Sequence, residues 1–205
     1  SADYTRFLFS WHRMIGDRPE GIEAPFELLH QLAGYEAPAA AWVGDILPVR
    51  VKEYDHVWLD ALCSSGRIAW GRFRQPRVDN GKQPFGPIKT TPISLITRQN
   101  LALWAQTPQE NVPSSYVAQV AEALYERGAL FFDEIGSRTG LLKSQVEEGI
   151  SELVALGRIT ADSFTGLRAL LLVSRYRTRQ RRHKSLIFSM GMAGRWPRLP
   201  GGDAE

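Results

Sequence analysis

Basic side chains gather in two stretches of this 205-residue chain, and clustered arginine and lysine are the side chains that bind phosphate groups. The first stretch, residues 67–89, contains one acidic residue, Asp79, and the second, residues 171–198, contains none. Because the formal net charge of the whole chain is only +3, the remaining residues are acidic on balance. We therefore predict that the two basic stretches face a polyanion, although such segments can also serve solubility alone.

The candidate phosphate-binding residues are twelve of the basic residues in these two stretches. They are Arg67, Arg72, Arg74, Arg77, Lys82 and Lys89 in the first, and Arg175, Arg177, Arg179, Arg181, Arg182 and Lys184 in the second. Two tryptophans, Trp58 and Trp70, are candidates for stacking on unpaired bases, which needs no sequence match. The competing interpretation is that both tryptophans belong to a hydrophobic core, and core positions are the more frequent ones for this residue type.

The chain carries no recognisable catalytic pattern. It lacks a glycine-rich phosphate loop ending in lysine and the acidic motif of a helicase motor. Its single cysteine, Cys63, and its four histidines, His12, His30, His56 and His183, have no metal-ligand spacing. The adjacent Asp133 and Glu134 are interpreted as the capped start of a helix. We expect no catalytic residue, no metal and no cofactor in this chain.

The elements of residues 113–172 follow the order of a winged-helix unit. Apolar spacing predicts a helix over residues 116–127, a short strand over 129–132, a second helix over 133–139 capped by Asp133, and a third helix over 142–156. Two β-compatible runs, 158–164 and 167–172, are separated by Thr165-Gly166, which predicts a two-stranded wing. The third helix shows Glu147, Glu148 and Glu152, interpreted as a solvated face. Carboxylates there oppose the reading of DNA, because phosphate repels them.

The first half repeats this plan more loosely. Helices are expected over residues 4–14, 23–32 and 39–46, and another begins at its cap, Asp55, and stops at Ser65-Gly66. Strands are predicted over 67–73 and 90–98, joined by a polar segment that reads as a long wing. The expected fold is therefore α+β and helix-rich, with tandem winged-helix modules. The predicted domains are residues 1–105, 106–172 and a basic tail, 173–205, that leads to a further module.

The chain resembles the C-terminal region of the bacterial large helicase-related (Lhr) family over most of residues 3–197. The phrases that carry the resemblance are DYTRFLFSWHRM, GYEAPAAAWVGDILPVRVKEYDHVWLDALCSSGRIAWGRF, TTPISLITR, RGALFFDEIGSRTGLLKSQVEEGISELVALGRITADSF and GRW. The resemblance implies tandem winged-helix modules that follow an ATP-driven motor. Members are superfamily 2 DNA helicases that translocate on single-stranded DNA with 3′ to 5′ polarity.

From the resemblance we expect a non-catalytic DNA-binding or positioning region of such a helicase, with a role in DNA repair. DNA, single-stranded and contacted without regard to sequence, and neighbouring domains of the parent protein are the expected partners, with no membrane partner. ATP and magnesium would bind at a motor that this chain does not contain, and the expected location is the bacterial cytoplasm, at the nucleoid. Two alternatives stay open. The chain can be a protein-protein assembly scaffold, or an accessory part of a module that resembles winged-helix DNA glycosylases.

Overall fold

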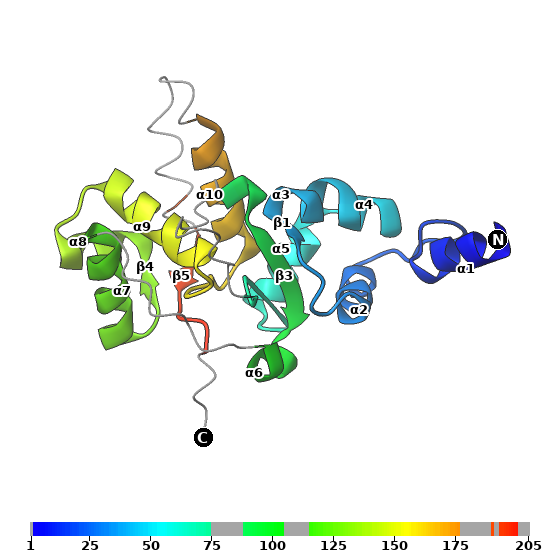
Figure 1. Ribbon diagram of the computed structural model, residues 1–205, viewed down its shortest axis with the longest axis horizontal. Helices are drawn as coiled ribbons and strands as arrows, with labels where there is room; N and C mark the ends of the chain where they lie inside the picture. The colour runs from blue at the N-terminus through cyan, green and yellow to red at the C-terminus, as the bar shows by residue number, and fades with distance from the viewer. Residues whose placement is uncertain (1, 75–87, 105–114, 177–189, 191–192, 201–205) are drawn as a thin grey trace, which may run out of the picture.

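The computed structural model describes residues 2–74, 88–104, 115–176, 190 and 193–200, with the side chains of 89 and 172–176 outside the description. Helix α1 (Ala2–Trp11) lies apart from the remaining elements in all three views (Figure 1). None of its residues is buried, although Tyr4, Phe7 and Trp11 are large and apolar. The predicted helix is confirmed, whereas its apolar side chains have no core to join.

Three helical segments and a three-stranded sheet form what we call the first unit, residues 23–97. The helical segments are α2 (Glu23–Gln31), a run built from α3 (Ala39–Ala41), the π-helical η1 (Trp42–Ile46) and α4 (Leu47–Arg50), and α5 (His56–Ser64). The strands are β1 (Ala37–Pro38), β2 (Ile68–Gly71) and β3 (Pro92–Thr97), antiparallel in the order β1-β3-β2. The helix predicted over residues 39–46 is longer than expected, because the helical run continues through Pro48 to Arg50.

Local sequence explains the limits of α5 and its place against the sheet. The Asp55 carboxylate accepts the amide hydrogen of Val57 at 2.9 Å, as a helix cap does, and Gly66 follows the helix with φ of +75°. Leu59, Leu62 and Cys63 are buried on its inner side. Ile68 then pairs with Thr97, which places the C-terminal end of α5 beside the sheet.

The second unit, residues 115–161 together with 193–198, has the same order of elements. Helix α7 (Ser115–Arg127) precedes β4 (Leu130–Phe131), α8 (Phe132–Thr139) and α9 (Lys143–Ala155), as predicted. The cap of α8 differs from the prediction, because Glu134 and not Asp133 accepts the amide hydrogen of Phe131, at 2.8 Å. Strand β5 (Arg195–Trp196) pairs with β4, and Ile159 bridges to Arg198 on the other side of β5.

The predicted wing over residues 158–172 is wrong, because α10 (Phe164–Tyr176) occupies most of it. Thr165-Gly166 lies in the first turn of this helix, and the Ser163 hydroxyl accepts the amide hydrogen of Gly166 at 3.3 Å. A Cβ at Gly166 would lie 3.1 Å from the carbonyl oxygen of Ala193, so this glycine serves close packing. The predicted domain limit at 172 therefore falls inside a helix.

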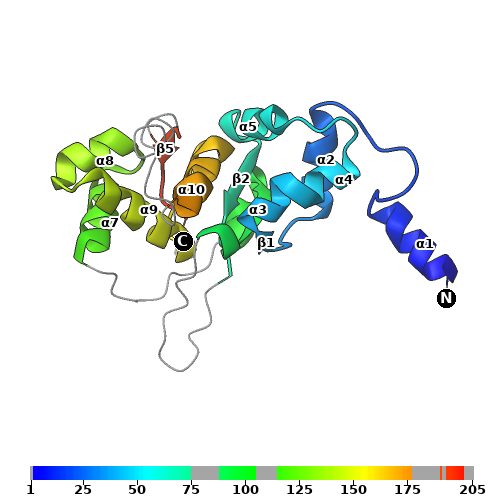
Figure 2. The same ribbon diagram turned by 90° about the horizontal axis from the view of Figure 1, so that it is seen from above.

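Helix α10 lies between α9 and the sheet of the first unit, as Figures 1 and 2 agree. It contacts α5, α3 and η2 (Ile88–Thr90) of the first unit. The largest buried cluster contains residues of both units, among them Trp42, Trp70 and Trp196. A smaller cluster forms where Leu199 meets Phe73 and Ile96, near η3 (Arg98–Asn100) and α6 (Leu101–Trp104). Separate folding of the two units stays a prediction, and residues 105–114, which contain the expected boundary, lie outside the description.

Candidate nucleic-acid interface

Helix α5 is the third helix of the first unit and has an uncovered outer face. His56, Val57, Ala61 and Ser64 are exposed, and the Val57 side chain, although apolar, is 55% exposed. The outer face carries no carboxylate except that of the cap, Asp55. A neutral, exposed helix following a helix-turn-helix can approach a phosphate backbone without charge repulsion.

Helix α9, the corresponding helix of the second unit, is covered. From Gln145 to its end at Ala155 no residue is exposed. The prediction that Glu147 belongs to a solvated face is wrong, because its residue exposure is only 6%. Packing of α9 against α7, α8 and η2 accounts for this burial. The burial of α9 is consistent with the inference that this helix does not read DNA. The cause is its coverage by neighbouring elements as much as its negative charge.

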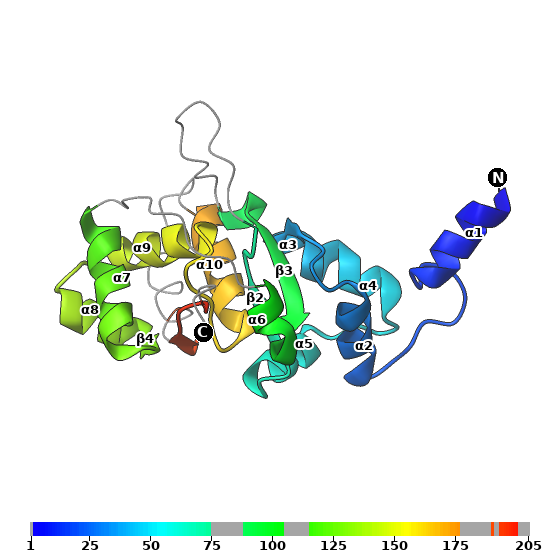
Figure 3. The ribbon, with the colours of Figure 1, turned by 60° about the horizontal axis from the view of Figure 1, so that its bottom comes forward.

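The candidate Arg67 is bound within the first unit (Figure 3 shows α2 near the end of β3). Its two terminal nitrogens each donate to a Glu23 carboxylate oxygen at 2.7 Å, and its guanidinium lies 3.9 Å from the centre of the Phe26 ring. The hydrogen bonds from Arg67 hold the pKa of Glu23 below its ordinary value and raise that of Arg67. The charge of Arg67 is thus already balanced by a carboxylate.

Arg72 follows β2 and reaches into the second unit. Its Nη1 donates to the carbonyl oxygen of Ala155, the last residue of α9, at 2.8 Å. The Arg72 side chain is half-buried, and burial lowers the pKa of its guanidinium. A Cβ at Gly157 would lie 2.3 Å from the Arg72 carbonyl oxygen, and Gly157 has φ of +70°, which glycine adopts without strain.

Arg74, two residues further, is exposed, and its backbone amide donates to a Glu36 carboxylate oxygen at 3.1 Å. Among the predicted contacts of the first stretch whose side chains the structure describes, Arg74 is the one exposed to solvent. The other predicted phosphate contacts lie outside the described side chains, so their role stays a prediction. They are Arg77, Lys82, Lys89, Arg175, Arg177, Arg179, Arg181, Arg182 and Lys184.

The two candidate stacking tryptophans differ. Trp70 is fully buried, its indole nitrogen donates to the Ser163 carbonyl at 3.1 Å, and its ring meets Phe164 and Trp196 edge to face. The stacking prediction for Trp70 is therefore wrong, because no face of the ring is open to a base. Trp58 is half-buried against Tyr54, with ring centres 6.4 Å apart.

A polar cluster between α5 and α10 was not anticipated from the sequence. Thr165 donates to one Asp60 carboxylate oxygen at 3.0 Å, and Arg168 donates to the other. Nearby, burial raises the pKa of the Tyr54 hydroxyl and raises that of the Cys63 thiol to about 12. The helical spacing of Asp60 within α5 gave no signal, because its partners lie more than a hundred residues later.

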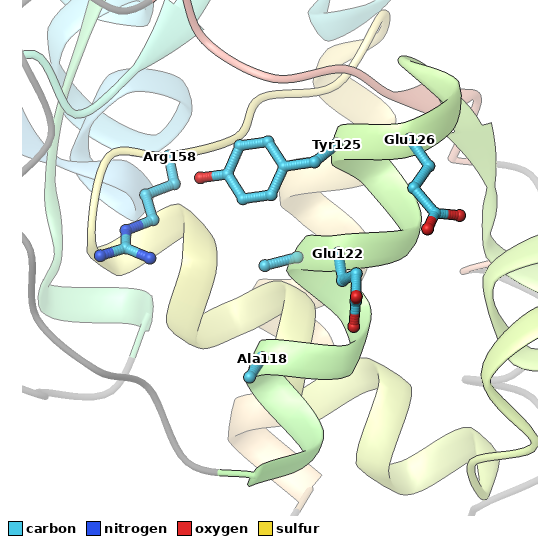
Figure 4. Close-up of a pocket in the computed structure, with 6 residues that line it drawn as sticks. Ala118, Glu122, Tyr125, Glu126 and Arg158 are labelled. Carbon is cyan, nitrogen blue, oxygen red and sulfur yellow. The ribbon is translucent and has the colours of Figure 1, made fainter.

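A shallow groove of about 430 Å³ runs along the outer side of α7 (Figure 4). Its lining includes Ala118, Tyr125 and Arg158, and the carboxylates of Glu122 and Glu126 point away from the Arg158 guanidinium. Arg198 stacks over the Tyr125 ring at 3.8 Å. The groove offers no nucleophile next to a base, so it gives no support to catalysis at this place.

Comparison with known proteins identifies relatives of the chain. Residues 1–88 match the family described as large helicase-related protein, winged-helix domain. The "Lhr helicase/ probable uracil glycosylase" of Mycolicibacterium smegmatis is 28% identical over 220 residues, which cover 98% of this chain and 14% of the relative. The "Lhr helicase/uracil glycosylase" of Escherichia coli is 30% identical over 162 residues, covering 74% of this chain and 10% of the relative. The chain therefore spans only a small part of these proteins.

Proposed function

Because residues 1–88 carry the winged-helix domain of the large helicase-related protein Lhr, we propose that this chain is a non-catalytic DNA-binding region of an Lhr-like, ATP-dependent 3′ to 5′ helicase. It binds the DNA backbone without reading sequence, and single-stranded DNA is its preferred form. It holds no cofactor itself, since ATP and magnesium act at a motor elsewhere in the parent. Its role is to position DNA and neighbouring domains during repair.

The observation that carries the proposal is the joint presence of an uncovered third helix and a basic segment between two strands in the first unit. The wing segment, residues 72–91 between β2 and β3, contains five basic residues and one acidic residue. Helix α5 adds a neutral surface with its N-terminal end exposed at His56 and Val57. In the second unit, by contrast, α9 is covered and α10 stands in the wing position. DNA contact is therefore assigned to the first unit.

The arrangement of strands supports a tandem pair of winged-helix units. In the first unit β3, the last strand, lies between β1 and β2. In the second, β5 lies between β4 and Ile159, so the last strand is again central. We infer one plan used twice, with α10 and the residues after it inserted where the second wing would be.

A scaffold function is the second candidate, and α1 favours it. Its residues Tyr4, Phe7 and Trp11 are 63%, 58% and 59% exposed, and exposed apolar clusters mark protein contacts. The glycosylase activity in the names of both relatives is a third possibility for the parent protein. Within the described residues we find no acid-base pair to which that activity could be assigned.

Salt titration of DNA binding tests the proposal. Labelled single-stranded and duplex DNA are titrated with the chain at several salt concentrations, using fluorescence anisotropy. Replacing Arg74, Arg77 and Lys82 together by glutamine should weaken binding of every sequence. Each lost phosphate contact should lower the slope of log K against log salt by about 0.7 on single strands and about 0.9 on duplex.

A matched control removes positive charge elsewhere. Lys52 and Lys143 form exposed ion pairs with Glu20 and Asp133, at 2.9 and 3.2 Å, outside the wing segment. Their glutamine variants should bind DNA with the affinity and slope of the original chain. Equal losses in the wing variant and the control would point to diffuse charge attraction. An original chain that binds no DNA at low salt would favour the scaffold function.

A further inference from the structure

Two contacts between distant residues tie α9 and α10 to the first unit at places that matter for the proposed DNA contact. One joins Arg72, the first residue of the wing segment, to the end of α9. The other joins Asp60 of α5 to Thr165 and Arg168 of α10. The two elements assigned to DNA are thus each held by a helix that follows α7 in the chain.

The hydrogen bond to the Ala155 carbonyl oxygen directs the Arg72 side chain to the end of α9 and away from a DNA phosphate. The last carbonyl groups of a helix lack partners within it and carry partial negative charge, so a guanidinium is a fitting partner for the Ala155 oxygen. The backbone approach of Gly157 to the Arg72 carbonyl oxygen fixes the main chain at the same point. Arg74 is exposed two residues later. Neighbouring arginines of one segment therefore have different surroundings.

The contact at Asp60 is equally closed. Both carboxylate oxygens accept hydrogen bonds from α10, and Arg168 also donates to the Thr165 hydroxyl at 3.2 Å. The side chains of Arg168 and Asp60 are only 24% and 19% exposed. Both side chains are partly buried, and each charge compensates the other, since an unpaired charge with reduced solvation is costly.

We propose that Arg72 and Arg168 are positioning residues through which α9 and α10 orient the exposed Arg74 and helix α5, and that neither arginine binds phosphate. This inference rests on the proposed DNA binding by the first unit. Arg72 holds the backbone that leads from β2 to the exposed Arg74. Arg168 sets the angle of α5 on the sheet. The second unit, through α9, and α10 therefore act together as a brace for a DNA surface that they do not themselves contribute.

Single glutamine variants separate positioning from phosphate contact. Arg72→Gln and Arg168→Gln should each weaken DNA binding about 3- to 10-fold at every salt concentration, because the loss of a charge-assisted hydrogen bond loosens an element without removing a phosphate contact. The slope of log K against log salt should stay that of the original chain. Arg74→Gln should instead lower the slope by about 0.7 to 0.9. Lys52→Gln, which breaks an exposed pair with Glu20 outside both basic stretches, serves as control for the loss of one charge.

Hydrogen exchange gives a measurement that needs no DNA. In Arg72→Gln, backbone amides at the end of α9 should exchange faster, because the contact that joins this helix end to Arg72 is lost. In Arg74→Gln they should not. Arg72→Lys keeps a cation that can donate to the Ala155 oxygen and should restore both exchange and affinity. It also covers the case in which the glutamine variant fails to fold.

The outcomes are distinct. A lowered salt slope in Arg72→Gln or Arg168→Gln would make that arginine a phosphate contact and overturn the inference. If Arg72→Gln and Arg168→Gln both bind DNA with unchanged affinity while Arg74→Gln alters binding, the two arginines have a structural role only. That result would overturn the inference as well. If the original chain binds no DNA, the proposed function fails. Faster exchange confined to the Arg72 and Arg168 variants would then still establish the brace between the units, and unchanged exchange would refute it.

Discussion

Replacing Trp70 by phenylalanine tests whether this residue belongs to the core or to a base-stacking surface. The indole nitrogen donates to the Ser163 carbonyl oxygen at 3.1 Å, and Thr160 donates its hydroxyl hydrogen to the Trp70 carbonyl oxygen. The ring centre lies 6.4 Å from those of Phe164 and Trp196. Trp70 belongs to β2, whereas its neighbours belong to α10 and β5. The substitution therefore acts on the junction between the units.

The expected loss can be estimated from these contacts. Phenylalanine removes the hydrogen bond, which contributes about 0.5–1.5 kcal/mol, and leaves the Ser163 carbonyl with fewer partners. It also vacates part of the volume beside Trp196, at about 0.8 kcal/mol for each missing buried carbon. Together these effects lower the free energy of unfolding by about 2–3 kcal/mol. Trp70→Ala, which removes the ring, should cost about 3–5 kcal/mol.

Urea unfolding followed by far-ultraviolet circular dichroism measures the loss, and the slope of the transition reports how much surface unfolds. Trp58→Phe is the matched control, because Trp58 is half-buried and its ring has one edge-to-face partner, Tyr54. It should lower the free energy of unfolding by less than about 1.5 kcal/mol. Both variants should bind DNA as the original chain does, once corrected for the folded fraction.

The opposite pattern would refute the reasoning. If Trp70→Phe leaves the free energy of unfolding unchanged and weakens the binding of single-stranded DNA by about 1–3 kcal/mol, the ring stacks on a base and the junction is not as described. A variant in which only the first unit loses protection from hydrogen exchange would show that the two units do not share this core.

Two further substitutions or conditions follow from packing and burial. Gly34→Ala should lower the free energy of unfolding by about 1–3 kcal/mol in urea, because its Cβ would lie 2.0 Å from Cη2 of Trp104; Gly44→Ala, whose Cβ would meet nothing within 4 Å, is the control and should not destabilise the chain. Burial raises the pKa of the Cys63 thiol from 9.0 to about 12, so the thiol of the folded chain should resist alkylation at pH 8 until the chain unfolds. Because the pKa of the thiol is higher in the folded chain than in the unfolded one, the stability that this thiol contributes is present below pH 9 and is lost as pH rises from 9 to 12. Thermal unfolding at several pH values measures this loss. If Cys63→Ser loses as much stability at alkaline pH as the original chain does, the assignment to Cys63 is contradicted.

Much of the fold could be predicted because apolar spacing is a local property. The positions of α5, α7 and α9 follow from side chains three or four residues apart, which one face of a helix brings together. For residues 164–172 the same reasoning led to a wrong prediction. Phe164, Leu167 and Leu170 have the spacing of a helix, while Thr165-Gly166 favours a turn. Ser163, whose hydroxyl can cap a helix that begins at the next residue, was the signal in the sequence that favoured a helix.

The environment of the candidate site could not be predicted, because its partners lie far along the chain. Nothing near Arg67 indicates that Glu23 will neutralise it, and nothing near Arg72 indicates Ala155. A basic residue looks the same in sequence whether it faces a phosphate or a helix end. For Glu147, the neighbouring Glu148 suggested a polar surface, whereas burial by surrounding helices removed it from solvent. Counting charges therefore located the basic stretches, but it did not show which arginine and lysine side chains are accessible to phosphate.

The late arrival of β5 has a consequence for the newly made polypeptide. The ribosome releases the chain from its N-terminal end, so the sheet of the first unit can close once Thr97 has emerged. The sheet of the second unit has to wait for Arg198, about a hundred residues later, or roughly 5–20 s at the usual pace of protein synthesis. During that interval Trp70 lacks Phe164 and Trp196 and exposes its ring. Nascent chains arrested before residue 193 should therefore be the form of this protein that chaperones hold most strongly.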